Sequence, residues 1–301
     1  MNPQTDGLIL FNKPPGLTSF DALRDIKRTL GTGKVGHTGT LDKFAEGLLL
    51  VLTGRALKLS RWFTHCDKQY EGTICFGAET ETLDPEGAVI ANAPLPSREN
   101  VEQAISRFLG KIEQAPPAYS AIHIDGERAS ALARRGEAPE MRKRPVTIFK
   151  LELLSWEPPY AKIFVHCSSG TYIRSLARDI ALASGSRGYL TALLRTQVGG
   201  FKLGTGEEAS RELGVGSGES GIVHPIDKGV IECLGIPCLD ISSEDAKKVL
   251  HGKPLAYILK DISPVFGEEK TVFALFSDDA FIAIIEQQNN KWSYGYVNAG
   301  N

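Results

Sequence analysis

The chain has 301 residues, of which 42% are hydrophobic and 23% charged, with 31 glycines and 16 prolines. This composition is typical of a globular protein and excludes collagen, a coiled coil and wholesale disorder. The length suggests about two domains. The uninterrupted apolar runs are only a few residues long, far shorter than the ~20 residues of a membrane-spanning helix, and the N-terminus lacks the pattern of a secretory signal. We therefore expect a cytoplasmic protein.

The five cysteines form no C-x-x-C pair, so we expect reduced thiols and no metal site. The formal net charge of −2 does not exclude a nucleic-acid partner, because the charges are unevenly distributed along the chain. Residues 1–65 carry nine Lys and Arg against five Asp and Glu, and residues 119–150 carry seven against four. Residues 66–118 carry four against nine. A basic surface can therefore exist under a nearly neutral total.

Short apolar runs and period-two alternation predict strands over residues 8–11, 48–52, 68–76, 119–124, 146–154 and 161–167. The first predicted helix follows a cap at Thr18 or Ser19, and Phe20 and Leu23 fall on its apolar spacing. Further helices are predicted over residues 56–63, 98–109 and 171–183. This mixture of strands and helices, without regular βα alternation, favours an α+β fold with a mixed sheet.

A change of pattern near residue 236 predicts a domain boundary there. The glycine- and serine-rich segment 214–221 before it is expected to be a surface loop. After the boundary, one short helix over residues 244–250 is followed by strands over residues 271–276, 281–286 and 292–297. We expect a domain over residues 1–235 and a small β-barrel-like module over residues 236–301.

Two glycine-rich patterns lie close together. The spacing Gly31-x-Gly33-x-x-Gly36 matches the dinucleotide fingerprint in letters, but a predicted helix precedes it where that fingerprint requires a strand. The following stretch places Asp42 in a glycine-hinged loop just before an apolar strand. From the residues alone, Asp42 is either a turn former or a reactive group displayed by a fixed scaffold.

The run GHTGTLDKFAEGLLLVLTG over residues 36–54 resembles the catalytic motif of the TruB family of tRNA pseudouridine synthases. Other segments resemble the family's motifs in the family's order: residues 12–16 (NKPPG), 68–70 (KQY), 117–121 (PAYSA), 167–174 (CSSGTYIR) and 194–196 (LRT). The resemblance covers residues 8–230, and the tail is more faintly similar to the family's PUA RNA-binding module. Lys43 departs from the pattern, since many bacterial members have proline after the catalytic aspartate.

The resemblance implies an active site built on Asp42 as the nucleophile. Arg174 would hold this carboxylate and keep its pKa low, and Tyr70 would stack on the target base and help to remove a proton. His37 would insert into the T loop of the tRNA, and Leu193 would pack against the base. Without the resemblance, Tyr70 and Leu193 are readable as core residues, Arg174 as a surface arginine and His37 as a structural histidine.

Further substrate contacts are implied for Lys13, for Arg178, which lies one helical turn after Arg174, and for a thumb-like insertion at about residues 122–145. The insertion is similar to a mobile loop that closes on the T arm, and we expect it to lack fixed structure without RNA. Its predicted RNA contacts are Arg134, Arg135, Arg142, Lys143 and Arg144.

The implied function is a stand-alone bacterial isomerase that converts uridine-55 in the T loop of tRNA to pseudouridine. The resemblance implies a monomer that uses no cofactor and no metal. Two alternatives remain: a non-catalytic RNA-binding or tRNA-folding protein, and an RNA-guided pseudouridine synthase of the archaeal and eukaryotic type. The presence of Asp42 favours an enzyme, and the insertion after Ala121 favours the stand-alone form.

Overall fold

The structure is a computed structural model that describes residues 6–137, 139–204, 223–255, 271–289 and 291–298. In the first 204 residues the strands and helices are β1 (Gly7–Lys13), α1 (Ser19–Leu30), β2 (Val35–His37), β3 (Glu46–Thr53), η2 (Gly54–Leu59), α2 (Ser60–Thr64), β4 (Lys68–Phe76), β5 (Ala78–Thr80), β6 (Val89–Asn92), α3 (Arg98–Ser106), β7 (Gly110–Gln114), β8 (His123–Ile124), β9 (Glu127–Arg128), α4 (Ala129–Arg134), β10 (Arg144–Glu157), β11 (Tyr160–Cys167), α5 (Ile173–Ala183), β12 (Gly188–Val198) and β13 (Phe201–Lys202). The predicted loop at 214–221 lies outside the described residues.

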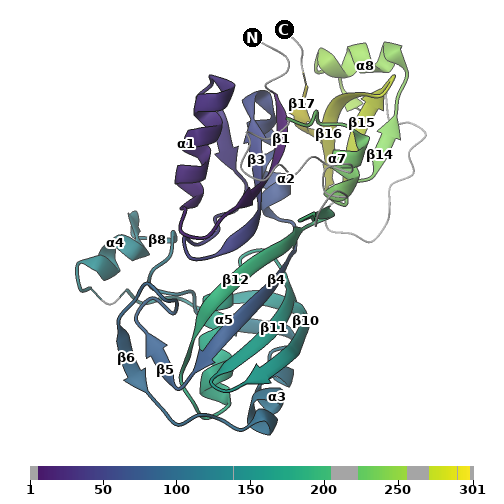
Figure 1. The fold of residues 1–301 in the computed structure, drawn as a ribbon. Helices are drawn as coiled ribbons and strands as arrows, with labels where there is room; N and C mark the ends of the chain where they lie inside the picture. Colours follow the sequence, from purple (N-terminus) through teal and green to yellow (C-terminus); the bar gives the residue numbers. More distant parts are fainter. Residues whose placement is uncertain (1–5, 138, 205–222, 256–270, 290, 299–301) are drawn as a thin grey trace.

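A nine-stranded mixed sheet forms the body of the molecule (Figure 1). Its order is β1-β3-β12-β4-β11-β10-β7, with β2 added to β3 and β13 added to β12. All neighbouring strands run antiparallel except β3 and β12, which pair in parallel. The predicted α+β class with a mixed sheet is confirmed.

Helices α3 and α5 cover one face of the sheet, and the main core lies between this face and the helices. Strand β4 shows why, because every second side chain, from Lys68 to Phe76, is buried. The apolar members of that row, such as Ile74, pack with Ile163 of β11 and with Leu176 of α5. The alternation that predicted a half-buried strand over residues 68–76 therefore describes its actual orientation.

Strand β12 occupies the centre of the sheet, and the sequence patterns missed it. Register shifts interrupt its pairing with β4 between Leu190 and Ala192 and again between Arg195 and Gln197. Each bulge moves the side-chain alternation by one residue, so no simple period of two survives in the sequence.

Several predicted elements differ in extent. The helix expected over residues 56–63 is a 3-10 turn, η2, followed by the short helix α2, and the strand expected over 119–124 is present only as β8. The insertion contains the hairpin β8–β9 and α4, in contrast to the expected lack of fixed structure. Burial of Ala129 and Ala133 gives this small unit an apolar contact of its own.

In helix α1, Thr18 is the cap, and its hydroxyl accepts a hydrogen bond from the Asp21 amide. Phe20, expected on the apolar stripe, is instead 65% exposed. The buried face is centred on Ala22, Leu23 and Ile26, which places Phe20 roughly 110° away around the helix axis.

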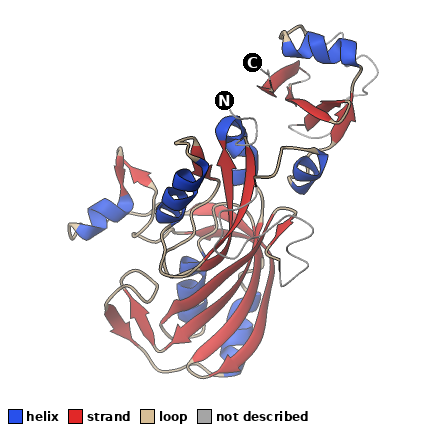
Figure 2. Cartoon of the chain, turned by 45° about the horizontal axis from the view of Figure 1, so that its top comes forward, coloured by secondary structure: helices blue, strands red, loops and turns tan. Residues whose placement is uncertain are grey.

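The C-terminal region contains α7 (Lys228–Cys233), β14 (Cys238–Asp240), α8 (Ser243–Leu250), β15 (Thr271–Ser277), β16 (Ala280–Gln288) and β17 (Lys291–Val297). Its four strands form a separate sheet in the order β14-β15-β16-β17, set apart from the larger sheet in Figure 2. Among the described residues the two outer strands do not pair with each other, so this sheet is open and the expected barrel-like closure is not seen in it.

The two faces of the C-terminal sheet serve different cores. Phe273 and Leu275 pack with α8, whereas Phe276 and Ile284 join a cluster that contains Phe63 and other residues of the first 204. Polar contacts reinforce this junction at α2. Nη2 of Arg61 is 2.9 Å from Oε1 of Glu286 and donates to the Gly295 carbonyl. None of the described helices is long and apolar enough to cross a membrane.

Candidate active site

A cavity of about 490 Å³ opens where the Asp42 loop, strands β4 and β12, and the residues before α5 meet. Asp42, Tyr70, Arg174 and Leu193, which come from four separate segments, all line it. The structure therefore brings together the three predicted catalytic residues and one predicted base contact.

Asp42 and Arg174 form a close ion pair at this cavity. Nη2 of Arg174 donates to Oδ1 of Asp42 at 3.0 Å, and Nε lies 2.9 Å from Oδ2, although its N–H is not aimed for a hydrogen bond. The Arg174 side chain is 6% exposed and the Asp42 side chain 33%. The arginine is thus fixed beneath a carboxylate that remains open to the cavity.

Asp84 is a second carboxylate on the same guanidinium, and the sequence patterns missed it. Nη1 of Arg174 donates to Oδ2 of Asp84 at 3.1 Å and to the Thr82 carbonyl at 2.8 Å, and Nη2 also donates to the Tyr119 carbonyl. The Asp84 side chain is 6% exposed. Its only signal in the sequence is an Asp-Pro step in an acidic stretch, which predicts a turn rather than a buried ion pair.

The pKa of the Asp42 carboxyl is raised above its ordinary value of 3.8, mainly because burial penalises the charged form. Arg174 opposes this shift, while the nearby carboxylates of Asp84 and Glu86 add to it. The expectation that Arg174 keeps this pKa low is therefore wrong in its net sign. The sequence showed the arginine but neither the burial of the carboxyl, which is the larger effect, nor the second carboxylate on the same guanidinium.

Tyr70 and Leu193 form one wall of the cavity from the neighbouring strands β4 and β12. They are 7% and 6% exposed, and both belong to the main core as well. Burial raises the pKa of the Tyr70 hydroxyl to about 12, so this group is protonated at neutral pH. A flat ring and a branched aliphatic side chain at the mouth of a core suit contact with a planar base.

Arg195 is a further residue of the site, and it holds the loop that carries Asp42. Its guanidinium is almost fully buried and donates to the carbonyls of Leu48 at 2.7 Å, Gly39 at 3.3 Å and Thr40 at 3.4 Å. Its positive charge also partly opposes the rise in the pKa of the nearby Tyr70 hydroxyl. The sequence placed Arg195 in a family motif without assigning it a role.

Lys13 does not contact the cavity, which corrects its predicted role in substrate binding. The residue is 0% exposed, and Nζ donates to the carbonyls of Pro14 at 2.9 Å, Leu17 at 2.8 Å and Ala45. Burial lowers the pKa of this amine to about 8. Lys13 therefore joins the turn after β1 to the end of the Asp42 loop.

His37 ends β2, immediately before the cavity-lining Thr38. Burial, aided by the charge of Arg195, lowers the pKa of the His37 imidazole, so the ring is neutral at pH 7. Its buried Nδ1 has no hydrogen-bond partner in the described part of the chain. The predicted contact of His37 with RNA remains a prediction.

The predicted basic contacts separate into groups. Arg134 lines the Asp42 cavity, as does Arg128 of β9, whereas Arg135 is paired with Glu127 and Glu137. Arg178 does not line the cavity, because it pairs with Asp179 at 2.8 Å.

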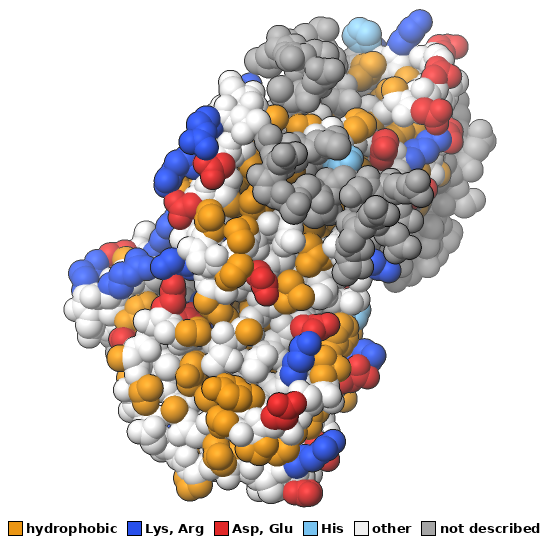
Figure 3. Space-filling view, in the orientation of Figure 1, with side chains coloured by type: hydrophobic (Ala, Val, Ile, Leu, Met, Phe, Trp, Pro, Cys, Tyr) orange, Lys and Arg blue, Asp and Glu red, His pale blue; other side chains and the backbone are white. Residues whose placement is uncertain are grey.

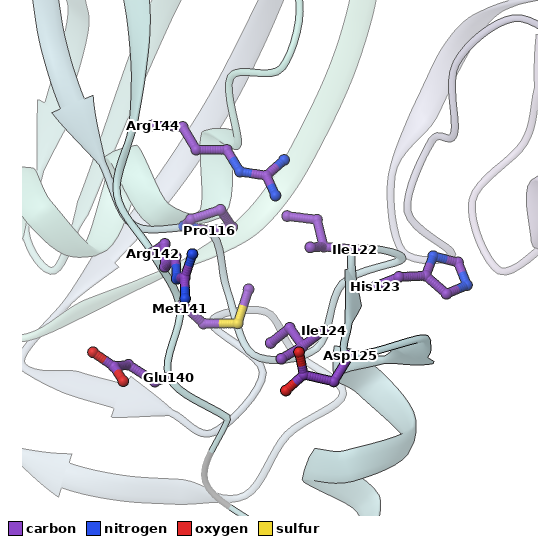
Figure 4. Close-up of a pocket in the computed structure, with 9 residues that line it drawn as sticks. All are labelled: Pro116, Ile122, His123, Ile124, Asp125, Glu140, Met141, Arg142 and Arg144. Carbon is purple, nitrogen blue, oxygen red and sulfur yellow. The ribbon is translucent and has the colours of Figure 1, made fainter.

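Arg142 and Arg144 line a second cavity of about 440 Å³, which is formed mostly by the insertion itself (Figure 4). Its apolar wall includes Ile122, Ile124 and Met141. Burial raises the pKa of the Asp179 carboxyl, and the nearby charges of Arg178 and Lys143 oppose that shift. Within the described ranges, no three His, Cys, Asp or Glu side chains are grouped to hold a metal ion.

Comparison with known proteins places this site in a family. Residues 27–173 match the TruB family pseudouridylate synthase (N terminal domain). The tRNA pseudouridine synthase B of Bordetella avium is 50% identical over 202 residues, or 66% of this chain and 83% of the relative. That of Treponema denticola is 47% identical over 216 residues, or 65% of this chain and 60% of the relative. The chain belongs to the TruB family, which confirms the resemblance drawn from its motifs.

A solved structure of a Cbf5-Nop10-Gar1 complex shares the fold. Its match has a TM-score of 0.68 at 23% identity and covers 99% of this chain and 84% of the other. A second, from an H/ACA RNP bound to a substrate RNA containing 2'-deoxyuridine, has a TM-score of 0.66 at 21% identity. These likenesses extend over both sheets of the molecule.

Proposed function

We propose that the protein isomerises uridine-55 in the T loop of tRNA to pseudouridine, with Asp42 as the nucleophile. The observation that carries the proposal is the Asp42 carboxylate itself, one-third exposed at a cavity and fixed from below by a buried arginine. Family membership supports the reaction, and the names of the relatives support tRNA as the substrate.

The reaction breaks the bond between N1 of uracil and C1′ of the ribose and forms a bond between C5 and C1′. The C5 proton is lost to solvent and N1 gains a proton, so atoms and electrons balance without a redox partner. While the glycosidic bond is open, the Asp42 carboxylate acts on the nucleoside. It either attacks the sugar or base with an electron pair or stabilises it with its negative charge. Arg174 keeps that carboxylate oriented through the two nitrogens that face it.

A uridine reaches this cavity only after it has been flipped out of the RNA. Tyr70 and Leu193 then offer one wall for the uracil ring. Because burial raises the pKa of the Tyr70 hydroxyl to about 12, this group assists the proton loss from C5 as a relay: it takes up the C5 proton while it passes its own proton to solvent. Arg128 and Arg134 of the insertion reach the same cavity and supply positive charge near the backbone of the flipped nucleotide.

The remaining assignments follow from the same proposal. The chain comprises a catalytic domain over residues 1–235 and a PUA-like RNA-binding module over residues 236–301, and it acts as a cytoplasmic monomer. The separate C-terminal sheet with α8 on its outer face supports the module. The insertion at the cavity mouth supports action without a guide RNA, because this chain itself brings cations to the target.

The test is tritium release from C5 of uridine in a T-arm minihelix. We expect the wild type to release tritium and Asp42→Asn to release none, since the amide cannot act as a nucleophile. Glu102→Gln, which removes one carboxylate from the exposed surface of α3, is the control and retains release. Binding without release by the wild type would favour the RNA-folding alternative, and full activity of Asp42→Asn would disprove the assigned nucleophile.

A further inference from the structure

Helix α1 exposes an aromatic side chain that the active site described above does not use. At 65%, Phe20 is the most exposed of the large hydrophobic side chains among the described residues. Isolated exposed apolar residues are common and need no explanation. The position and neighbours of this one are more specific.

Phe20 is held directly beside the catalytic loop. The hydroxyl of the preceding residue, Ser19, accepts from the Leu41 amide and donates to the Leu41 carbonyl, both at 2.9 Å. Leu41 is the neighbour of Asp42, and both line the cavity. The first turn of α1 is therefore tied to the loop that carries the proposed nucleophile, and Phe20 projects from that turn.

Two cations share the exposed face of Phe20. Arg24 and Lys27 follow one and two helical turns later, on the same side of the helix. Nζ of Lys27 lies 5.9 Å from the centre of the Phe20 ring, and the Arg24 side chain is 68% exposed. The ion pair of Arg24 with Asp21 is worth little in water, so Arg24 can exchange it for a phosphate.

Helix α1 also lies near the insertion, part of which lines the Asp42 cavity. The N-terminal end of α1 and the segment β8–α4 lie next to each other in Figures 1 and 2. Lys and Arg side chains gather over both elements in the space-filling view (Figure 3). The cavity of about 490 Å³ has room for about one nucleotide. The nucleotides on either side of a flipped uridine must therefore lie outside the cavity, across its rim.

An exposed aromatic ring with cations close by is what proteins use to bind unpaired nucleotides. Base-on-aromatic stacking contributes ~1–3 kcal/mol per base, and neighbouring cations bind the phosphates. We infer that this α1 face (Phe20, Arg24 and Lys27) is an RNA-contact surface, on which a nucleotide flanking the target stacks on Phe20. The inference rests on the proposed function, because it takes the substrate to be RNA that enters the Asp42 cavity.

The first experiment replaces Phe20 and measures RNA binding and turnover with the T-arm minihelix. Phe20→Ala is expected to raise Kd and KM by about 5- to 50-fold, as loss of one stacked base would, with kcat at saturation changed by less than ~2-fold. Phe20→Trp is expected to restore binding, and its fluorescence should be quenched when RNA binds. Phe149→Ala, at another exposed phenylalanine (54%), is the matched control. Equal affinity of Phe20→Ala and wild type would overturn the inference.

The second experiment tests the cations through the salt dependence of binding. The double variant Arg24→Gln/Lys27→Gln is expected to lower the slope of log Kd against log salt by about 1 to 2. The control Arg98→Gln/Lys111→Gln removes the same charge from α3 and β7 and should leave the slope unchanged. An unchanged slope in the α1 variant would contradict the assignment.

The two proposals fail in distinguishable ways. If the wild type binds the minihelix but releases no tritium, the reaction is wrong while the α1 surface is still tested by binding. If Phe20→Ala abolishes a dimer seen by sedimentation and leaves RNA affinity intact, the surface binds a second copy of this chain and the inference is wrong.

Discussion

Arg174 connects more of the candidate site than any single contact of Asp42, because its buried guanidinium satisfies two carboxylates and two carbonyls. A buried charge left without partners is costly, so this network fixes the arginine before RNA arrives. Asp42 receives orientation from it. The pKa of Asp42 is nevertheless raised, and its ionised form is disfavoured by folding.

This raised pKa predicts that Asp42→Asn stabilises the fold while it removes activity. Above the unfolded value of 3.8 the wild type must keep a disfavoured charge, and the neutral amide avoids it. The gain should be present at pH 7 and vanish as the pH falls below 3.8, where the carboxyl is protonated in both states. Thermal unfolding of both proteins at several pH values measures this. A lower Tm for Asp42→Asn at pH 7 would show that the Arg174 contact outweighs burial.

Arg195 predicts a different phenotype, because it touches the backbone of the loop rather than the cavity alone. Arg195→Met removes a donor from three carbonyls, and we expect a loss of about 1–3 kcal/mol in the free energy of unfolding. Loosening the loop should lower kcat by ~10²-fold, with little change in Kd for RNA. Arg195→Lys keeps the charge but not the fork of donors, so it should recover only part of kcat. A change in Kd with kcat preserved would assign Arg195 to binding.

Some residues of the candidate site could be predicted from the sequence, and others could not. Asp42, Tyr70 and Arg174 could be predicted, because each lies in a motif that is recognised from the order of its residues alone. Asp84 could not be found, because its partner is 90 residues away and only the fold brings the two together. Lys13 was misassigned because a motif shows that a lysine is required, but not whether its amine points to substrate or to carbonyls.

At the scale of elements, the parallel contact between β3 and β12 places the catalytic loop. Gly47 faces Arg195 across this pair and has a φ of +104°. A Cβ there would overlap the Arg195 backbone, so Gly47→Ala should destabilise the protein by more than ~1 kcal/mol. Gly33→Ala, where the added carbon meets nothing within 4 Å, is the control. Chemical denaturation would show the prediction wrong if the two variants were equally stable.

The elements that could be predicted were those with a regular alternation of apolar residues or a clear capping residue. The pattern over residues 68–76 gave the bounds of β4, and Ser97 correctly marked the start of α3. The bulges in β12 hid a central strand, and the exposed side of α1 could not be read from apolar spacing, since Phe20 counts as apolar on either face. Long-range pairing and burial decide such cases, and neither is encoded locally.

For the whole molecule, the important feature is the core shared between the two sheets. Phe276 is fully buried in it, next to Phe281 at 5.5 Å between ring centres. Phe276→Ala should cost about 3–5 kcal/mol and shift a single calorimetric transition for the entire chain. Phe273→Ala removes a ring from the opposite face of the same sheet and is the comparison. Two separate transitions in the wild type would contradict this coupling.

Helix α2 gives this junction a consequence for the choice of RNA. Arg61 binds the C-terminal sheet, while Thr64 of the same helix lines the Asp42 cavity. If a tRNA arm binds with its uridine in the Asp42 cavity and its stem on the C-terminal sheet, the distance between these two places is fixed by the protein. Minihelices with one base pair added to or removed from the stem should still bind, but they should place the wrong nucleotide in the cavity. Their rate of tritium release should therefore be lower than that of the unaltered minihelix.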